Sequence, residues 1–516
     1  MAFLRSIATV GGYTLVSRLL GFVRDILLAA FLGAGVLADA FFVAFKLPNF
    51  FRRLFAEGAF SAAFVPMFAG FFEKEGRDKA KRFAEEVFAV LFLGLAFFIA
   101  VAEIAMPWLI YALAPGFADE PERYGFAVVF SRITFPYLLF ISLVSLMGGV
   151  LNSFGRFAAA AATPILLNLF LIGSLLILAD FTATPGHALA IGVALAGVGQ
   201  FLWLAAALRR ANFSLRLSFP RLTPDVKAFL GRLAPGAIGA GVVQVNLFID
   251  IVLASLLPTG AISFLYYADR VNQLPLGVVG IAVGTALLPL LSRQLRAGQR
   301  EAANANQNRA LEAALFLTLP ATAALVLLSE PIVRVLFARG AFGGAEVVAA
   351  ARTLSAYATG LPAYVLVKVL APAYFARGDT ATPVKIAGAA VVVNVVLSVA
   401  LMIPFAQVGI ALATAIASWF NAALLVTGLL RRGDFTFDGR SRRRLPRTAL
   451  AALAMGGLAF GAAKLLEAPL TGGEAERCVT LGLLIGGSTL LYFLLARLLG
   501  AFEKGDLRAL FRKKPA

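Results

Sequence analysis

Charged side chains lie inside the first two long apolar stretches of the chain, where they could bind an anion. These residues are Arg18, Arg24, Asp25, Asp39, Lys46, Arg52, Arg53 and Glu57. A basic residue at the centre of a membrane helix costs about 2.5–3.5 kcal/mol if it faces lipid, so we expect these side chains to face water, protein or a substrate. Guanidinium groups donate paired hydrogen bonds to phosphate oxygens. The excess of arginine therefore predicts a site for a phosphate-bearing ligand.

A smaller group of the same kind occurs in the second half of the chain. It consists of Asp269, Arg270 and Gln273, which precede Pro275, and of Lys368 in a later apolar stretch. If this group converges with the first one, the two form a cavity of excess positive charge. Such a cavity suits an anionic ligand.

Ion pairing between neighbours is the competing interpretation of these charges. The candidate pairs are Arg24–Asp25, Arg53–Glu57 and Arg270–Asp269. Each pair would hold neighbouring helices together without binding anything. The remaining cations, Arg18, Lys46, Arg52 and Lys368, have no obvious local partner. We therefore favour the anion site.

Helical geometry gathers several of the charges in the second stretch on one face. At about 100° per residue, Asp39, Lys46, Arg53 and Glu57 fall within about 40° of one another. The second stretch thus carries a polar stripe, which is the arrangement that a helix beside a hydrated cavity needs.

Other chemistry is poorly supported. Asp250, Asn394 and Thr414 are a weaker candidate for a cation site, and we favour buried polar packing as their explanation. The chain has one cysteine, Cys478, and one histidine, His187. Multi-cysteine metal sites and catalytic triads therefore lack their usual residues. We expect no metal, no cofactor and no enzymatic activity.

The composition predicts the elements that hold these charges. Of 516 residues, 60% are apolar and 14% charged, and the mean hydropathy is +0.87. These values indicate an all-α polytopic membrane protein with about fourteen transmembrane helices. The expected spans are 8–32, 36–70, 83–113, 125–151, 158–180, 187–208, 228–256, 262–292, 309–337, 346–375, 383–404, 408–430, 446–466 and 478–500.

The net charge of +18 is concentrated on one set of loops. Basic residues cluster within 74–82, 209–232, 293–300, 431–447 and 504–514, whereas the opposite loops hold few, among them Arg123. Basic loops stay on the cytoplasmic side, so we expect both termini in the cytoplasm. The charge then reports topology and contact with membrane lipids, and nucleic acid is not an expected partner.

An internal repeat organises the helices. An offset of about 225 residues aligns Asp25-Ile26-Leu27-Leu28-Ala29 with Asp250-Ile251-Val252-Leu253-Ala254. Each half then contains six helices. Because six is an even number, the two halves cross the membrane in the same direction and are parallel repeats. We expect two parallel six-helix lobes around a central cavity, at 1–215 and 216–435, followed by two additional helices and a tail at 436–516. This architecture suits alternating access.

Several of these segments resemble one family. The run Ser17-Arg18-Leu19-Leu20-Gly21-Phe22-Val23-Arg24-Asp25 and the run Lys46-Leu47-Pro48-Asn49-Phe50-Phe51-Arg52-Arg53 resemble the MurJ (MviN) lipid II flippases. So do Tyr267-Ala268-Asp269-Arg270-Val271 and Phe337-Ala338-Arg339-Gly340. That family belongs to the multidrug/oligosaccharidyl-lipid/polysaccharide exporter superfamily, and the likeness spans nearly the whole chain.

The resemblance implies a substrate and a set of roles. It implies transfer of the undecaprenyl-diphosphate-linked peptidoglycan precursor, lipid II, from the cytoplasmic to the periplasmic leaflet of the bacterial cytoplasmic membrane. Arg18, Arg24, Arg52 and Arg270 would bind the diphosphate. The cavity and its gates would contain Ser17, Asp25, Asp39, Lys46, Arg53, Glu57, Asp269, Gln273 and Lys368. The last two helices would form a groove for the lipid tail.

Two other functions stay open at this point. One is export of drugs or of other polyprenyl-linked oligosaccharides by the same superfamily, although a basic cavity does not suit organic cations. The other is a membrane scaffold that transports nothing. Lipid II and membrane lipids are the expected partners of a flippase, with other cell-wall synthesis proteins as a further class.

Overall fold

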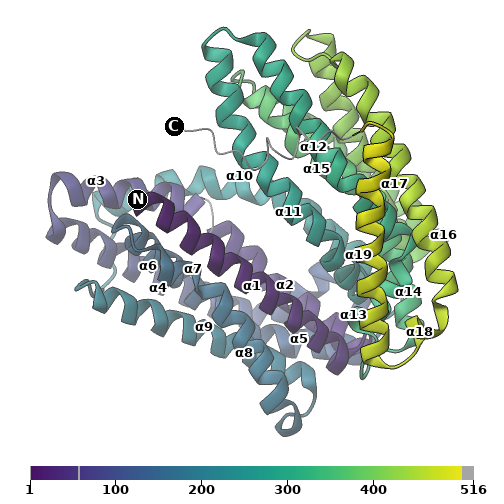
Figure 1. Cartoon of the computed structure of the whole chain (residues 1–516). Helices are drawn as coiled ribbons and strands as arrows, with labels where there is room; N and C mark the ends of the chain where they lie inside the picture. The colour runs from purple at the N-terminus through teal and green to yellow at the C-terminus, as the bar shows by residue number, and fades with distance from the viewer. Residues whose placement is uncertain (1, 56–58, 502–516) are drawn as a thin grey trace. The chain divides into compact units, whose positions relative to one another are not determined.

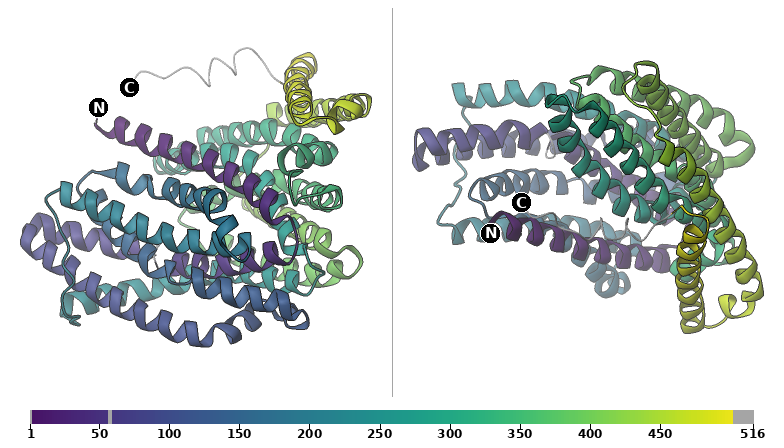
Figure 2. Two further views of the ribbon diagram at one scale, coloured as in Figure 1. Left: turned by 90° about the horizontal axis from the view of Figure 1, so that it is seen from below. Right: turned by 45° about the horizontal axis from the view of Figure 1, so that its top comes forward.

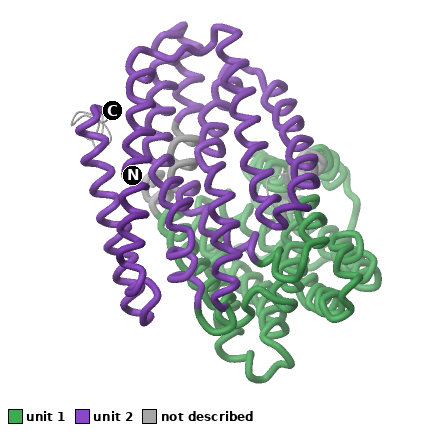
Figure 3. Tube along the Cα trace, turned by 90° about the vertical axis from the view of Figure 1, so that its right-hand side faces the viewer, with its two compact units in different colours: residues 1–263, 339–342 green, residues 264–338, 343–516 purple. Residues whose placement is uncertain are grey.

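The computed structural model describes residues 2–55 and 59–501, and all secondary structure in these ranges is helical (Figure 1). Within them, the side chains of residues 2–8, 53–55, 59, 236–247 and 278–286 are outside the described part. The chain forms two compact units (Figure 3). Residues 1–263 and 339–342 form the first unit, and residues 264–338 and 343–516 form the second. The fold class is thereby confirmed as all-α.

The first unit is built mainly from the N-terminal helices. They are α1 (Ala2–Leu32), α2 (Val36–Phe55), α3 (Ala59–Lys74), α4 (Arg77–Leu113), η1 (Pro115–Asp119), α5 (Pro121–Thr134), α6 (Tyr137–Ser153), α7 (Phe157–Ala161), α8 (Thr163–Leu178), η2 (Ala179–Phe181), α9 (Pro185–Arg210) and α10 (Pro224–Ser255). Within this unit α2 packs on α5, α8 on α9, and α3 on α4, α6 and α10.

The second unit contains the remaining helices. They are most of α11 (Ala261–Arg296), then α12 (Arg300–Leu327), α13 (Ser329–Phe337), α14 (Gly344–Ala358), α15 (Leu361–Phe375), α16 (Ala381–Arg431), α17 (Gly439–Leu465), α18 (Glu467–Thr471) and α19 (Glu474–Leu498). The last two long helices, α17 and α19, lie side by side (Figure 2).

The helices of the structure do not always coincide with the expected spans. The span expected at 125–151 is divided between α5 and α6 at Phe135-Pro136. The spans expected at 383–404 and 408–430 join in α16 across a kink at Ala406, whose φ is 48°. Within the described residues, nine helical stretches are long and apolar enough to cross a membrane. The protein is thus a multi-pass membrane protein, and the count of fourteen spans stays a prediction.

Phenylalanine rings form the core of the first unit. Phe60, Phe64 and Phe68 repeat every four residues along one face of α3, and their rings stack at 5.3 and 5.7 Å. The rings of Phe83 of α4 and Phe229 of α10 pack against the Phe64 ring, with centroid distances of 5.7 and 6.2 Å. Ring pairs of this kind stabilise by about 0.5–1.5 kcal/mol each beyond their buried area. The aromatic core thereby fixes the helices that surround the site.

Two glycines attach residues 339–342 to the first unit. The backbone N–H of Ala341 donates to the Ala30 carbonyl at 2.8 Å. Gly33 and Gly340 adopt positive φ angles of 63° and 54°. A Cβ atom on Gly340 would lie 2.2 Å from the Ala30 oxygen, so a side chain cannot be accommodated there. This close approach explains why a short segment between α13 and α14 belongs with α1.

Candidate functional site

Arg24 is held inside the first unit by two partners. Its Nε and Nη2 donate to Asp25 Oδ1 at 3.0 and 2.7 Å, and its Nη1 donates to Asn168 Oδ1 at 2.9 Å. Asn168 in turn donates through Nδ2 to the Ser17 carbonyl at 2.9 Å, which ties α8 to α1. The side chains of Arg24 and Asp25 are both buried. The Arg24–Asp25 pair that competed with the anion site is therefore confirmed.

Arg52 lies at a cavity of about 490 Å³ inside the same unit. Its Nε donates to Asn49 Oδ1 at 3.2 Å, and its side chain is half-buried. Beyond α2, the lining comes from α3, α6, α7, α8 and α9, and its polar members are Ser61, Tyr137, Ser145, Asn152, Thr163 and Gln200. A guanidinium beside hydroxyl and amide groups can bind a ligand that carries both negative charge and hydrogen-bonding groups.

Gln200 contributes an acceptor to this cavity. Its Nε2 donates to the Thr163 carbonyl at 2.7 Å, and the residue is 1% exposed. Its Oε1 is buried and has no hydrogen-bond partner among the described residues. A buried acceptor without a donor costs about 1–3 kcal/mol, so this oxygen is suited to accept a hydrogen bond from a hydroxyl or amide N–H of a ligand.

Asp39, also on α2, is fully enclosed. It accepts from Arg123 Nη2 at 2.6 Å, from the backbone N–H groups of Gly260 and Ser263 at 2.8 Å, and from the Ser263 hydroxyl at 2.5 Å. Asp39 is 0% exposed and Arg123 is 1% exposed. The Arg123 guanidinium also lies 4.0 Å from the centre of the Phe117 ring. The expectation that Arg123 is a loop charge is wrong, because α5 buries it against Asp39.

The other predicted residues of the first unit lie in different surroundings. Arg18 is exposed, whereas Ser17, Lys46 and Asp250 are half-buried. Arg53 lies in α2, but its side chain is outside the described part, and Glu57 lies outside the described residues altogether. The polar stripe predicted from these charges is therefore untested at its last two positions.

The predicted residues of the second unit are partly connected. Gln273 donates to Asp269 Oδ2, one turn apart on α11. The Arg270 guanidinium lies 4.8 Å from the centre of the Tyr266 ring, a cation–π contact. Lys368 is exposed on α15. Asn394 is buried and Thr414 donates to the Ile410 carbonyl at 3.0 Å, so both take part in the packing of α16.

Sequence reasoning missed three residues that complete these arrangements. They are Asn168, Arg123 and Gln200. Asn168 is 144 residues from Arg24, and Arg123 is 84 residues from Asp39. No local pattern marks such distant partners. The sequence did show that each of these residues is an amide or a charge within or beside an apolar helix. Such a polar group needs a partner, which indicates that a partner exists but not which residue it is.

Most of the chain matches the model of a known family. The model of the lipid II flippase MurJ family matches residues 28–475. The chain belongs to that family. A probable lipid II flippase MurJ from Rhizobium tropici is 46% identical over 524 residues, which cover 100% of this chain and 98% of the relative. Membership in the MurJ family places the chain among flippases and not among enzymes.

Solved structures agree with this assignment. A structure described as lipid II flippase MurJ in an inward closed conformation matches with a TM-score of 0.77 and 25% identity, over 98% of this chain and 99% of that one. An inward-facing multidrug resistance MATE family transporter of the MOP superfamily matches with a TM-score of 0.60 at 14% identity, over 84% of this chain and 95% of that one. The second likeness concerns the fold alone. The resemblance to the MurJ family is thereby confirmed.

Proposed function

We propose that this chain moves lipid II from the cytoplasmic to the periplasmic leaflet. The observation that carries the proposal is Arg52 at a polar cavity of about 490 Å³, in a chain that belongs to the lipid II flippase MurJ family. A diphosphate cannot cross roughly 30 Å of hydrocarbon unaided. A basic, hydrated cavity can hold the headgroup while the polyprenyl tail stays in the lipid.

The diphosphate is bound by arginines that differ in how they act. Arg18 and Arg52 have exposed or half-buried side chains, which supports direct contact with phosphate oxygens. Arg24 is oriented by Asp25 and Asn168, and because Asp25 compensates its charge it would contribute N–H donors in a fixed direction. Arg270 is the fourth arginine that we propose for the diphosphate, and its guanidinium lies 4.8 Å from the centre of the Tyr266 ring. Phosphate contacts to guanidinium groups are charge-assisted and therefore strong.

Release of the headgroup follows from alternating access. The lobes proposed at 1–215 and 216–435 rock against each other, and the helices of 436–516 hold the tail. The remaining charged and polar residues line the cavity or gate it, namely Ser17, Asp25, Asp39, Lys46, Arg53, Glu57, Asp269, Gln273 and Lys368. A gating role for Asp39 is supported by its hydrogen bonds, because it accepts from the backbone N–H groups of Gly260 and Ser263 at the start of α11.

The orientation that we propose puts both termini in the cytoplasm. The basic loops at 74–82, 209–232 and 431–447 support it, since short basic loops are retained on that side. The membrane is then the bacterial cytoplasmic membrane. Cell-wall synthesis proteins stay predicted partners.

Complementation tests this function. Cells depleted of their own flippase would receive this chain, and lipid II on the outer leaflet would be measured. Restored exposure is the expected result. Normal expression without any restored exposure would refute the flippase function, whereas uptake or export of an organic cation instead would favour a drug exporter.

A further inference from the structure

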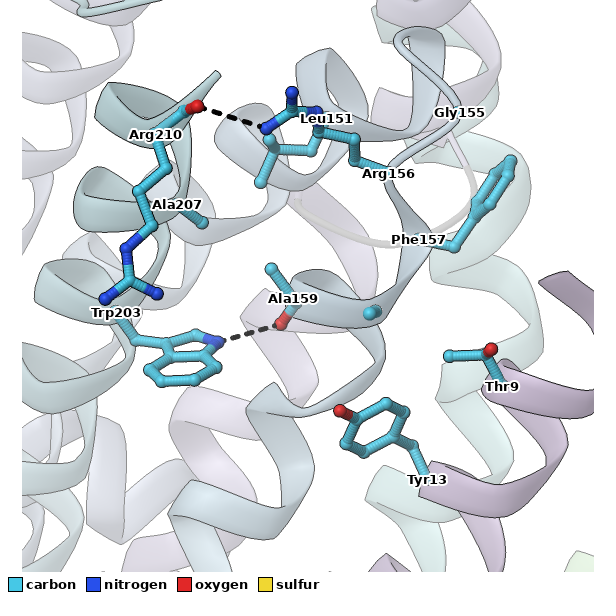
Figure 4. A pocket seen from close by; sticks show the side chains of 11 residues that line it. Thr9, Tyr13, Leu151, Gly155, Arg156, Phe157, Ala159, Trp203, Ala207 and Arg210 are labelled. Atoms are coloured by element: carbon cyan, nitrogen blue, oxygen red, sulfur yellow. Dashed lines mark hydrogen bonds between the residues drawn. The ribbon is translucent and has the colours of Figure 1, made fainter. Parts of the chain in front are cut away.

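A second cavity, of about 430 Å³, lies in the first unit (Figure 4). It is bounded by α1, by the turn between α6 and α7, and by the last turns of α9. Its polar lining residues are Thr9, Tyr13, Arg156, Trp203 and Arg210. It shares no lining residue with the cavity beside Arg52. The two cavities are therefore separate sites.

Two arginines stand together at this cavity. Arg156 Nη1 donates to the backbone carbonyl of Arg210 at 3.3 Å, whereas the Arg210 side chain extends toward Trp203 (Figure 4). Both side chains are exposed. Over the described part of the chain, neither guanidinium forms an ion pair with a carboxylate. The pair is thus available to an anion from outside the protein.

Aromatic residues also line the cavity. Trp203 is held in place because its Nε1 donates to the Ala159 carbonyl at 3.1 Å. It precedes Arg210 by seven residues on the same face of α9, which is about 10 Å along the helix axis. Tyr13 of α1 also lines the cavity, together with Leu151. The Arg210 side chain extends toward Trp203 (Figure 4), so positive charge and an indole ring lie together, as they do at a membrane interface.

We propose that this cavity binds the phosphate of an anionic phospholipid in the cytoplasmic leaflet. The proposal rests on the orientation proposed above, which places the Arg210 end of α9 at that leaflet. Basic pockets between membrane helices on the cytoplasmic side bind anionic headgroups. Free phosphate would leave the apolar and aromatic surface without a partner, whereas a phospholipid covers it with its glycerol and acyl chains.

Lipid II is the other phosphate-bearing lipid, and the lining disfavours it. The Arg52 cavity offers six neutral polar side chains besides Asn49, which suit a glycan and a peptide. The cavity beside Arg156 offers hydroxyls from Thr9 and Tyr13 and is otherwise apolar, aromatic or basic. A small headgroup with one phosphate matches this lining better.

Lipid retention by the purified full-length chain tests the proposal. Native mass spectrometry would compare phosphatidylglycerol with phosphatidylethanolamine, which is zwitterionic and has no net charge, each also in competition with lipid II. The wild type should retain phosphatidylglycerol preferentially. The Arg156→Gln/Arg210→Gln variant should bind it about 25-fold more weakly, at roughly fivefold per arginine. The matched control is Arg209→Gln, an exposed arginine outside the cavity, which should behave as the wild type.

Trp203 provides a readout that does not depend on the double variant. The chain has three tryptophans, so replacing Trp108 and Trp419 by Phe leaves Trp203 as the reporter. Phosphatidylglycerol brominated near the headgroup should quench its fluorescence, and Arg156→Gln should reduce the quenching. Equal retention in the double variant and Arg209→Gln, absence of quenching, or displacement of phosphatidylglycerol by equimolar lipid II would each overturn the proposal.

Discussion

Asp39 and Arg52 lie on the same helix, α2, yet their charges have different surroundings. Asp39 is 0% exposed and accepts hydrogen bonds from Arg123, Gly260 and Ser263. Arg52 is half-buried, donates to the neutral Asn49 amide, and lines a cavity. One charge is neutralised inside the protein, and the other faces space that a ligand can fill.

The contrast shows that a charge at membrane depth does not by itself indicate a binding site. Desolvation makes a buried ion pair costly to break, because the remaining partner is left without compensation. A charge beside a cavity keeps part of its hydration and exchanges it for a ligand. Arg24 is intermediate, since it is buried and paired but also adjoins Asn168, a neutral partner. Substitutions should separate these classes.

The largest effect is expected from Arg123→Ala. This change leaves the Asp39 carboxylate buried without its cation, which destabilises a protein by about 3–5 kcal/mol. The melting temperature in detergent and the folded yield should both fall. Arg132→Ala is the matched control, because Arg132 is exposed on the same helix, α5. Equal melting temperatures for the two variants would show that the Asp39–Arg123 pair is not the structural element described above.

A smaller loss is expected from Asn168→Ala. The variant removes the acceptor of Arg24 Nη1 and the donor to the Ser17 carbonyl. A hydrogen bond to a charged group contributes about 1.5–3 kcal/mol, so stability should fall by less than in Arg123→Ala. Thermal unfolding of the two variants side by side measures the order. A larger loss of stability in Asn168→Ala than in Arg123→Ala would contradict the distinction drawn between Asp39 and Arg24.

Gln200→Leu should change recognition more than stability. Loss of a neutral hydrogen bond weakens binding by about 2- to 13-fold, since each bond contributes about 0.5–1.5 kcal/mol. The expected loss applies to lipid II, whereas undecaprenyl diphosphate without the glycan should bind as before. Titrations of both lipids measure this. Equal weakening for the two lipids would mean that Gln200 does not contact the glycan or peptide.

The smallest effect concerns a pair outside the membrane spans. A hydrogen bond from Arg432, at 2.7 Å, and further bonds from Thr382 hold the pKa of Asp379 below its ordinary value of 3.8. A lowered folded-state pKa stabilises the protein above pH 3.8, and this stabilisation disappears as the pH falls further. The difference in melting temperature between wild type and Asp379→Asn should therefore shrink below that pH. A difference that is independent of pH would contradict this prediction.

The sequence was sufficient for features that depend on composition and on neighbouring residues. Apolar length predicted the helical membrane fold, and adjacency predicted the Arg24–Asp25 pair. Features that depend on packing were not accessible. Arg123, the partner of Asp39, is 84 residues away in the sequence. Its position between apolar stretches predicted a loop charge, and only the packing of α5 on α2 buries it. No sequence pattern marks Gln200, because its proposed role depends on a buried side-chain oxygen beside a cavity.

Titration of lipid II onto the folded full-length chain, with wild type beside Arg52→Ala, probes the cavity-facing charge most directly. Arg52→Ala should melt as the wild type does and bind lipid II about 10- to 150-fold more weakly, because a hydrogen bond to a charged group contributes about 1.5–3 kcal/mol. Wild-type affinity in a folded Arg52→Ala protein would contradict the assignment of this cavity to the diphosphate-linked headgroup.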